Sequence, residues 1–383
     1  MLAVVVLVAS ACGSSAKHTT SDAPTTVPSA RAAVAAYAKP GPFTVGYTTL
    51  HLSDRDVAVW YPADAAAVAG KPKATYDQAT PLPPNLKGLV PPKYNTVVTM
   101  DAYTDVRANT KGPFPVVLFS HGAGGYRLVN SELDVGIASW GFVVVSVDYL
   151  EHGLAAQVAS AGKQTAQPSA DQMRTLAALD RRLMLAGLDL VTSESRRAGS
   201  VLSGAVDSSR VGAIGHSAGG GTAFDVLSDP RVKVAIGWAP VPPSGAPVDK
   251  PTMIIGAGGD IALTPTVLAK TYASFPAPKR WVEIGGTRAG HDTFTDTCTV
   301  IRAGGGLVEF ALQHHFIAAN LAKLATNGCT NTDLDPPAFW AVVQHFTVAE
   351  LRNVLGIDPQ PVGLGDGITH AFPGIPITYQ HQP

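Results

Sequence analysis

Short apolar runs separated by turns rich in glycine recur through the middle of the chain. Longer stretches with apolar residues at helical spacing lie between several of them, the clearest at residues 129–139, 171–194 and 218–227. Continuous apolar runs are typical of strands that are buried on both faces of a sheet. The runs are residues 115–119, 142–147, 211–214, 232–238, 252–256 and 280–284. Strands alternating with helices predict an α/β fold with a mostly parallel central sheet flanked by helices.

Weaker patterns flank this alternating region. Residues 43–52 and 56–61 alternate well enough to predict an antiparallel strand pair. The proline-rich residues 62–113 show few periodic runs and predict a long surface excursion. Beyond the alternating region, residues 307–326 predict a helix and residues 337–355 one or two more, which together form a C-terminal helical extension.

The chain has 383 residues, of which 46% are hydrophobic and 15% charged. One large domain over residues 39–383 fits this length better than two equal domains. We expect residues 292–336 to form a lid-like helical insertion in this domain. Residues 359–383 are rich in proline and glycine and predict an irregular tail.

The N-terminus resembles an export signal. Residues 1–11 are almost wholly apolar but too few to span a bilayer, which predicts a signal peptide. Ala9-Ser10-Ala11-Cys12 resembles a bacterial lipoprotein box, so Cys12 is the predicted lipidation site and residues 12–38 a disordered tether. The alternative is a buried N-terminal strand with an ordinary cysteine. The first interpretation predicts a protein lipid-anchored to the outer face of the cell membrane, or secreted.

Cysteine count and charge narrow the class further. Besides Cys12 the chain has only Cys298 and Cys329, which could join in an oxidising compartment or remain separate buried thiols. A net charge of −1 without a basic cluster argues against a nucleic-acid partner and against binding to anionic membranes, so membrane contact is expected through the lipid only. No metal-ligand spacing or phosphate loop occurs. We expect a monomer without metal or cofactor.

The most informative motif is Gly215-His216-Ser217-Ala218-Gly219, between an apolar run and a predicted helix. This order is typical of the nucleophile elbow of a serine hydrolase, a sharp turn that exposes the serine. Side chains at positions 215 and 219 would collide with such a turn. The alternative is a glycine-rich loop with a chance serine.

The surrounding sequence favours the elbow. In folds with this motif, an acid and then a histidine follow the serine, each after a later strand. Asp260 follows the run 252–256, and His291 follows the run 280–284. A turn residue and a surface-loop histidine are the respective alternatives, with Asp292 and Asp296 as spare acids.

These residues predict a division of labour. Ser217 would attack an ester carbonyl, His291 would take its proton, and Asp260 would orient the imidazole. The backbone amides of Ala123, in the Gly-rich turn 120–125, and Ala218 would stabilise the oxyanion. We interpret His121 and His216, which flank the two turns, as structural.

The chain resembles a bacterial branch of the α/β-hydrolases. That branch contains esterases like platelet-activating-factor acetylhydrolase, dienelactone-hydrolase-like proteins and actinobacterial polyester-degrading cutinases. The resemblance lies in residues 113–122, 138–145, 206–211, 215–220 and 251–256 and in the loops of Asp260 and His291. It implies an α/β-hydrolase fold and a serine esterase. Dienelactone hydrolases use a cysteine nucleophile, so the serine at position 217 argues against that activity.

The resemblance also bears on the substrate. Polyester cutinases place an aromatic residue after the oxyanion glycine and a tryptophan beyond the strand after the elbow helix. Here those positions hold Ala123 and Val241, and Trp238 lies three residues early. Gly122, Trp238 and Val241 are the predicted pocket residues, without a clamp for flat aromatic polyesters.

The sequence therefore predicts an exported carboxylesterase or lipase-like hydrolase that acts on small-molecule or lipid esters. A polyester hydrolase and an acyltransferase that uses the same acyl-enzyme are the alternatives among enzymes. A catalytically silent surface lipoprotein that binds a ligand is the alternative from another class.

Overall fold

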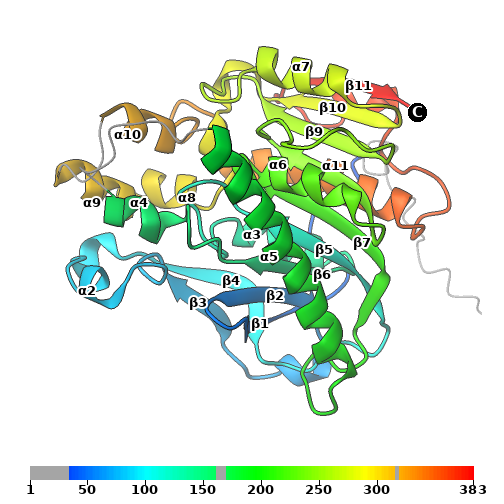
Figure 1. Cartoon of the computed structure of the whole chain (residues 1–383), viewed down its shortest axis with the longest axis horizontal. Helices are drawn as coiled ribbons and strands as arrows, with labels where there is room; N and C mark the ends of the chain where they lie inside the picture. Colours follow the sequence, from blue (N-terminus) through cyan, green and yellow to red (C-terminus); the bar gives the residue numbers. More distant parts are fainter. Residues whose placement is uncertain (1–33, 161–169, 315–318) are drawn as a thin grey trace, which may run out of the picture.

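The computed structural model describes residues 34–160, 170–314 and 319–383. The predicted signal peptide 1–11 and Cys12 lie outside the described residues and stay predictions. The described chain builds one 11-stranded sheet in the order β11-β10-β9-β8-β7-β5-β6-β2-β1-β4-β3 (Figure 1).

The centre of the sheet is parallel, as the apolar runs predicted. Each neighbouring pair among its six strands is parallel. They are β5 (Phe114–Ser120), β6 (Val143–Val147), β7 (Val206–His216), β8 (Val232–Trp238), β9 (Thr252–Ala257) and β10 (Lys279–Ile284). Every residue of β5, β6 and β9 is buried, because helices cover both faces.

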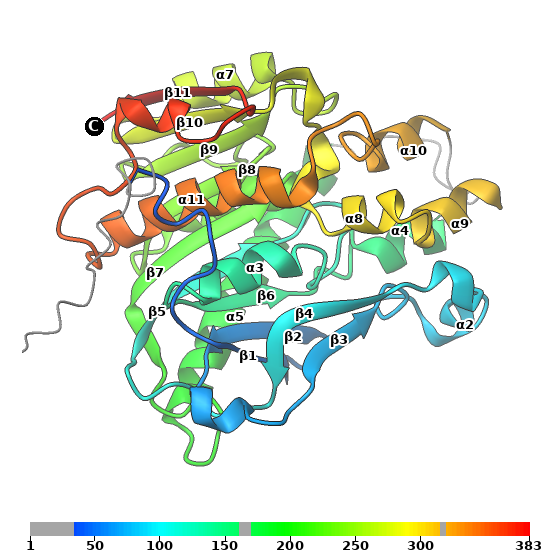
Figure 2. The ribbon, with the colours of Figure 1, turned by 180° about the vertical axis from the view of Figure 1, so that it is seen from behind.

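Two helical layers enclose this sheet. Alternate residues of β5 separate into two cores, Val117 and Phe119 on one face and Val116 and Leu118 on the other. The first core lies under α3 (Ser131–Ala138) and α11 (Pro336–Val354), which cross the sheet in Figure 2. The second lies under α5 (Ala170–Arg196), α6 (Ala218–Asp225) and α7 (Pro265–Ser274).

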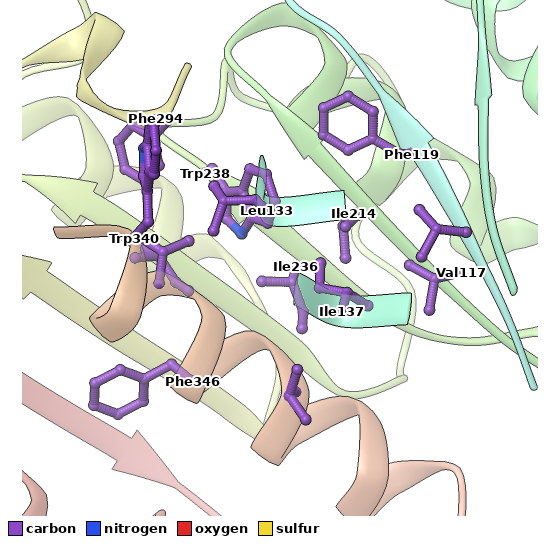
Figure 3. Close-up of a cluster of buried hydrophobic side chains, with 14 of the residues drawn as sticks. Val117, Phe119, Leu133, Ile137, Ile214, Ile236, Trp238, Phe294, Trp340 and Phe346 are labelled. Carbon is purple, nitrogen blue, oxygen red and sulfur yellow. The ribbon is translucent and has the colours of Figure 1, made fainter. Parts of the chain in front are cut away.

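Figure 3 shows the first core, in which Leu133 and Ile137 of α3 and Trp340 and Phe346 of α11 meet strand residues such as Ile236. These side chains are almost fully buried. Burying a large apolar side chain stabilises a fold by about 1.5–3 kcal/mol, so this layer contributes much of the stability of the domain.

The predicted antiparallel pair is confirmed, whereas the predicted surface excursion is wrong in part. β1 (Val45–His51) and β2 (Asp56–Pro62) pair in register. Residues 62–113 also supply β3 (Lys73–Asp77) and β4 (Val97–Thr104), which extend the sheet beyond β1. In β4 buried and exposed residues alternate, with Met100 and Ala102 on the buried face. The many prolines in residues 62–113 hide this pattern in the sequence. The short helix η1 (Ala65–Val68) precedes β3, and α2 (Pro84–Lys87) and η2 (Pro92–Tyr94) lie between β3 and β4.

The predicted tether ends earlier than expected. Tyr37 is only 5% exposed and packs edge-on against the ring of Trp140. Its backbone amide donates to Nδ1 of His345 in α11, and its hydroxyl donates to Asp358. The contact partners lie about 100 and 300 residues away, so no local pattern could show that residues 34–38 join the fold.

The C-terminal region differs from its prediction in two places. Among the described residues of 307–326, α9 (Leu307–Gln313) ends before a turn at His314, and α10 (Ala319–Ala325) is a separate helical segment. The predicted irregular tail contains η6 (Asp366–His370) and the edge strand β11 (Ile377–Gln382). β11 pairs antiparallel with β10, a partner about 100 residues earlier that composition cannot reveal. Together with α4 (Leu154–Ser160) and α8 (Thr297–Arg302), α9 and α10 gather at one side of the molecule (Figure 1).

Candidate active site

The nucleophile elbow forms where β7 ends at His216 and α6 begins at Ala218. Ser217 has φ 56° and ψ −120°, a strained conformation for a residue with a side chain, which costs about 1–3 kcal/mol. A Cβ at Gly215 would lie 2.1 Å from the carbonyl oxygen of Gly219, and one at Gly219 would lie 2.0 Å from that of Ser120. The two glycines are therefore required by close backbone approach, as the motif predicted.

The three predicted catalytic residues meet in one hydrogen-bonded chain. Asp260 follows β9, and His291 opens the short helix η5 (His291–Phe294) after β10. Nδ1 of His291 lies 2.8 Å from Oδ2 of Asp260, and Nε2 lies 2.9 Å from Oγ of Ser217. The carboxyl ends of parallel strands share one edge of the sheet, so residues 217, 260 and 291 converge there.

Burial and hydrogen bonds set the charges of this chain. Burial alone would lower the pKa of His291, but the hydrogen bond and charge of Asp260 outweigh it and hold the pKa above its usual range. Burial raises the pKa of Asp260, but His291 and the backbone amides of Ala262 and Leu263, each 2.8 Å from Oδ1, lower it overall. Asp260 is thus a charged acceptor that favours the protonated imidazole.

The spare acids lie elsewhere. Asp292 follows His291, and burial raises the pKa of its carboxyl to about 7, but its carboxylate does not take the place of Asp260 on Nδ1. Asp296 accepts from Ser131 and Tyr76 in a separate buried network. His291 is 6% exposed, so it is not a surface-loop histidine.

The predicted oxyanion turn lies against the nucleophile. A Cβ at Gly122 would be 3.0 Å from Cβ of Ser217, a tight contact that would require Ser217 to shift by a few tenths of an ångström. Ala123 is exposed in the turn, and Ala218 is the first residue of α6, where the helix N-terminus favours negative charge. Ala218 follows Ser217 directly, and Ala123 follows the glycine that lies against Ser217. The oxyanion role of their two amides stays a prediction.

His121 and His216 make structural contacts. Nδ1 of His121 donates to the carbonyl of Gly122, while Nε2 accepts from the amide of Tyr149. Nε2 of His216 donates to the carbonyl of His291 at 3.0 Å. Burial lowers the pKa of His121 to about 4 and that of His216 to about 3, so both stay neutral near pH 7.

One predicted pocket residue is wrong. Trp238 is fully buried, where its indole donates to Thr347 and packs against Phe119 and Phe294. It ends β8 with its side chain in the core under α11 (Figure 3), so it cannot face a substrate. Val241 is half-buried, and its amide donates to the carbonyl of Ser217 at 2.9 Å. Val241 and Gly122 therefore remain beside the nucleophile.

Cys298 and Cys329 form a disulfide, with Cα atoms 4.7 Å apart. The bridge encloses α8, α9 and α10 and lies next to the histidine loop. Two residues before Cys329 lies Asn327, which the sequence analysis missed. Its side chain accepts a hydrogen bond from the amide of His291 at 2.8 Å. Its only sequence signal is its place in Asn327-Gly328-Cys329, a turn before a bridged cysteine.

In the part of the chain that the structure describes, no group of three or more His, Cys, Asp or Glu residues could hold a metal ion. The same described residues contain no helix that is both long enough and apolar enough to cross a bilayer.

Comparison with known proteins decides the family. The family model described as PET hydrolase-like matches residues 109–303, half of the chain. This chain belongs to the PET hydrolase-like family. The matched region contains Ser217, Asp260 and His291 but ends before Asn327 and Cys329.

Individual relatives agree with this family assignment. The PET hydrolase-like chain is 29% identical over 174 residues to bis(hydroxyethyl) terephthalate hydrolase from Streptomyces coelicolor, covering 44% of this chain and 48% of that protein. It is 30% identical over 184 residues to cutinase est2 from Thermobifida alba, covering 46% and 52%. The chain thus spans about half the length of the curated relatives it matches.

A solved structure, the ferulic acid esterase from Streptomyces cinnamoneus, superposes with a TM-score of 0.61 at 23% identity, covering 89% of this chain and 98% of that chain. This likeness supports the α/β-hydrolase fold.

Proposed function

We propose that this PET hydrolase-like protein is a serine carboxylesterase that hydrolyses carboxylic esters through an acyl-enzyme on Ser217. The observation that carries the proposal is the continuous chain from Asp260 through His291 to Ser217, with both hydrogen bonds within 2.9 Å. A nucleophile, its base and the group that orients the base are thereby assembled before a substrate arrives. The relatives, which are named as ester-cleaving enzymes, support the same reaction class.

The geometry suggests the order of steps. Oγ of Ser217 attacks the ester carbonyl carbon while Nε2 of His291 takes its proton, and the amides of Ala123 and Ala218 stabilise the oxyanion. His291 then gives that proton to the departing alkoxide, and the carbon–oxygen bond to the alcohol breaks. Water repeats the sequence: His291 takes its proton, the acyl group leaves as an acid, and Ser217 regains its hydrogen. Each oxyanion amide typically contributes about 3 kcal/mol.

Polyester hydrolysis is a second candidate, favoured by the family match and by the terephthalate-ester relative. The aromatic clamp expected of polyester cutinases is absent at Ala123 and Val241, and the side chain of Trp238 is fully buried in the core. We therefore propose small soluble esters as the better substrates. Release of monomers from a polyester film, compared with turnover of nitrophenyl esters of increasing chain length, ranks the two.

The decisive test is Ser217→Ala. Turnover of nitrophenyl esters should fall by on the order of 10⁴–10⁶-fold while the melting temperature is kept. A fluorophosphonate probe should label the wild type at Ser217 and leave the variant unlabelled, which separates an enzyme from a silent binding protein. A hydrolase should release the free acid even when an acceptor alcohol is added. An acyltransferase would instead transfer the acyl group to the alcohol and form a new ester. More than a few per cent residual activity in the variant contradicts the assignment.

We propose further that the protein is exported and held at a membrane face by lipid on Cys12, as a monomer without other partners. The support is the N-terminal sequence alone: an apolar run, small residues before Cys12 and a polar stretch after it. A thioether-linked diacylglycerol with an amide-linked chain gives stable anchoring, because a single chain does not. Mass spectrometry of the native protein should find this modified cysteine as the first residue; an unmodified Cys12 contradicts the proposal.

A further inference from the structure

One side chain from outside the acid loop and the base loop joins the two. Asn327 lies after α10, two residues before Cys329. Its Oδ1 accepts from the backbone amide of His291 at 2.8 Å and from that of Ile261 at 3.2 Å. Its Nδ2 donates to the carbonyl of Gly259 at 3.2 Å. Asn327 thus bonds to the residues on both sides of Asp260 and to the backbone of the base itself.

The fit around Asn327 is close. A Cβ at Gly290, the residue before the base, would lie 2.6 Å from atoms of Asn327. The carbonyl of Asn327 accepts from the amide of Asp292 at 3.0 Å. The base is therefore enclosed on both sides of its backbone by one residue, and Asn327 cannot shift without moving residues 290–292.

The turn that carries Asn327 is itself anchored. The disulfide joins Cys329 to Cys298 in α8. The hydroxyl of Thr293 donates to the carbonyl of Gly328, and the guanidinium of Arg302 donates to the carbonyls of Cys329 and Leu334. The acid loop and the base loop also bond directly, because the amide of Gly259 donates to the carbonyl of Ala289 at 2.8 Å. The anchored side chain of Asn327 adds a second connection, closer to Asp260 and His291.

We propose that Asn327 is a positioning residue that aligns Asp260 with His291, supplied by the segment beyond the family-matched region. The inference rests on the proposed esterase function. Two loops that rise from different strands must place a carboxylate and an imidazole within hydrogen-bond reach. Misplacing a catalytic group by about 1 Å can lower the rate about 100-fold, so a side chain that bonds to both loops should increase the rate by holding them in position.

The experiment compares Asn327→Ala, Asn327→Asp and Asn109→Ala in the full chain with its disulfide. Asn109 is a matched control: it is also half-buried, donates to the carbonyl of Ala63 and accepts from the amide of Lys111. It lies before β5, at the opposite end of the strands from Ser217. kcat and KM for a nitrophenyl ester are measured from pH 5 to 9, with melting temperatures and free-thiol titration as checks on the fold.

We expect Asn327→Ala to lower kcat by about 10–100-fold with KM changed less than about twofold. Activity rises with pH as His291 loses its proton. Burial lowers the pKa of His291, and Asp260 raises it. If Asn327→Ala weakens the contact with Asp260, the pKa of His291, seen as the midpoint of this limb, should fall. Asn327→Asp keeps both acceptor bonds and adds a negative charge, but it loses the bond donated to the carbonyl of Gly259. It should recover part of kcat and move the limb to higher pH. Asn109→Ala should keep the wild-type kcat and limb.

Two results overturn the inference. The first is that Asn327→Ala keeps the wild-type kcat and the wild-type pH limb. The second is that Asn327→Ala loses kcat without any shift of the limb, and Asn327→Asp does not recover kcat. If the wild type hydrolyses no ester, the proposed function fails, and proton NMR decides the positioning role separately. The low-field resonance of the His291 Nδ1–H should then be present in wild type and Asn109→Ala and absent in Asn327→Ala. Its persistence in Asn327→Ala rejects the role.

Discussion

The elbow that carries Ser217 and the loops that carry Asp260 and His291 are held in place in different ways. The elbow is constrained mainly by close approach of main-chain atoms. A Cβ at Gly215 would lie 2.1 Å from the carbonyl oxygen of Gly219 in the same elbow, and one at Gly219 would lie 2.0 Å from that of Ser120 in the neighbouring strand β5. The two loops depend on a side chain, Asn327, that arrives from more than 30 residues beyond the base. The nucleophile is thus held by main-chain packing around a local motif, whereas its acid and base also depend on a side chain from a distant segment.

This difference predicts how substitutions in the two regions affect the fold and the activity. A change in the elbow alters the backbone that presents the nucleophile, so it should affect fold and chemistry together. A change in the segment around Asn327 should leave the residues of the triad present but misaligned. Three predictions test this contrast, from the largest expected effect to the smallest.

Replacing the acid while keeping its shape should give the largest loss. In Asp260→Asn the side chain no longer accepts from Nδ1 of His291 as a carboxylate, so the imidazole loses its orientation and the stabilisation of its charge. We expect kcat to fall by on the order of 10⁴-fold. Asp292→Asn is the matched control, since it removes a neighbouring buried carboxyl without touching Nδ1, and should retain activity within a few fold. Equal losses in steady-state kinetics would contradict Asp260 as the acid.

Gly219→Ala should break the elbow through sterics alone. The added methyl group would overlap the carbonyl of Ser120 at 2.0 Å, which the backbone of β5 cannot relieve cheaply. We expect a loss of at least about 3 kcal/mol in the free energy of unfolding, with activity lost in parallel. Gly365→Ala, where a Cβ would meet nothing within 4 Å, should change neither quantity in denaturant unfolding and ester assays. Normal stability of Gly219→Ala would show that the elbow is looser than described.

Removing the bridge should give the smallest effect on activity. The double variant Cys298→Ser/Cys329→Ser frees a loop of 31 residues, for which chain-entropy estimates give about 3–4 kcal/mol of stability. The bonds of Asn327 persist in the folded state, so we expect kcat to fall by less than about tenfold. Cleavage by protease between residues 293 and 335 should appear before global unfolding. Unchanged proteolysis would show that the bridge does not restrain this segment.

Much of the fold and the site could be predicted from the sequence, because the deciding interactions are local or periodic. The apolar runs identified the parallel strands of the central sheet, because strands buried on both faces are rich in apolar residues. In β10, which is only partly buried, the run also contains Arg280 and Glu283. The motif around Ser217 and the chain order of Asp260 and His291 predicted three residues that the structure joins at 2.8 and 2.9 Å. The disulfide followed from the cysteine count as one of two alternatives.

Other features were decided only by tertiary structure. β11 and the packing of Tyr37 depend on partners about 100 to 300 residues away, which no local pattern contains. Trp238 was predicted beside the substrate, but the end of β8 turns its side chain into the core under α11. Asn327 acquires its role from three backbone groups of two distant loops. Sequence determines what each segment tends to form, but backbone hydrogen bonds between segments form only after the sheet has brought the segments together.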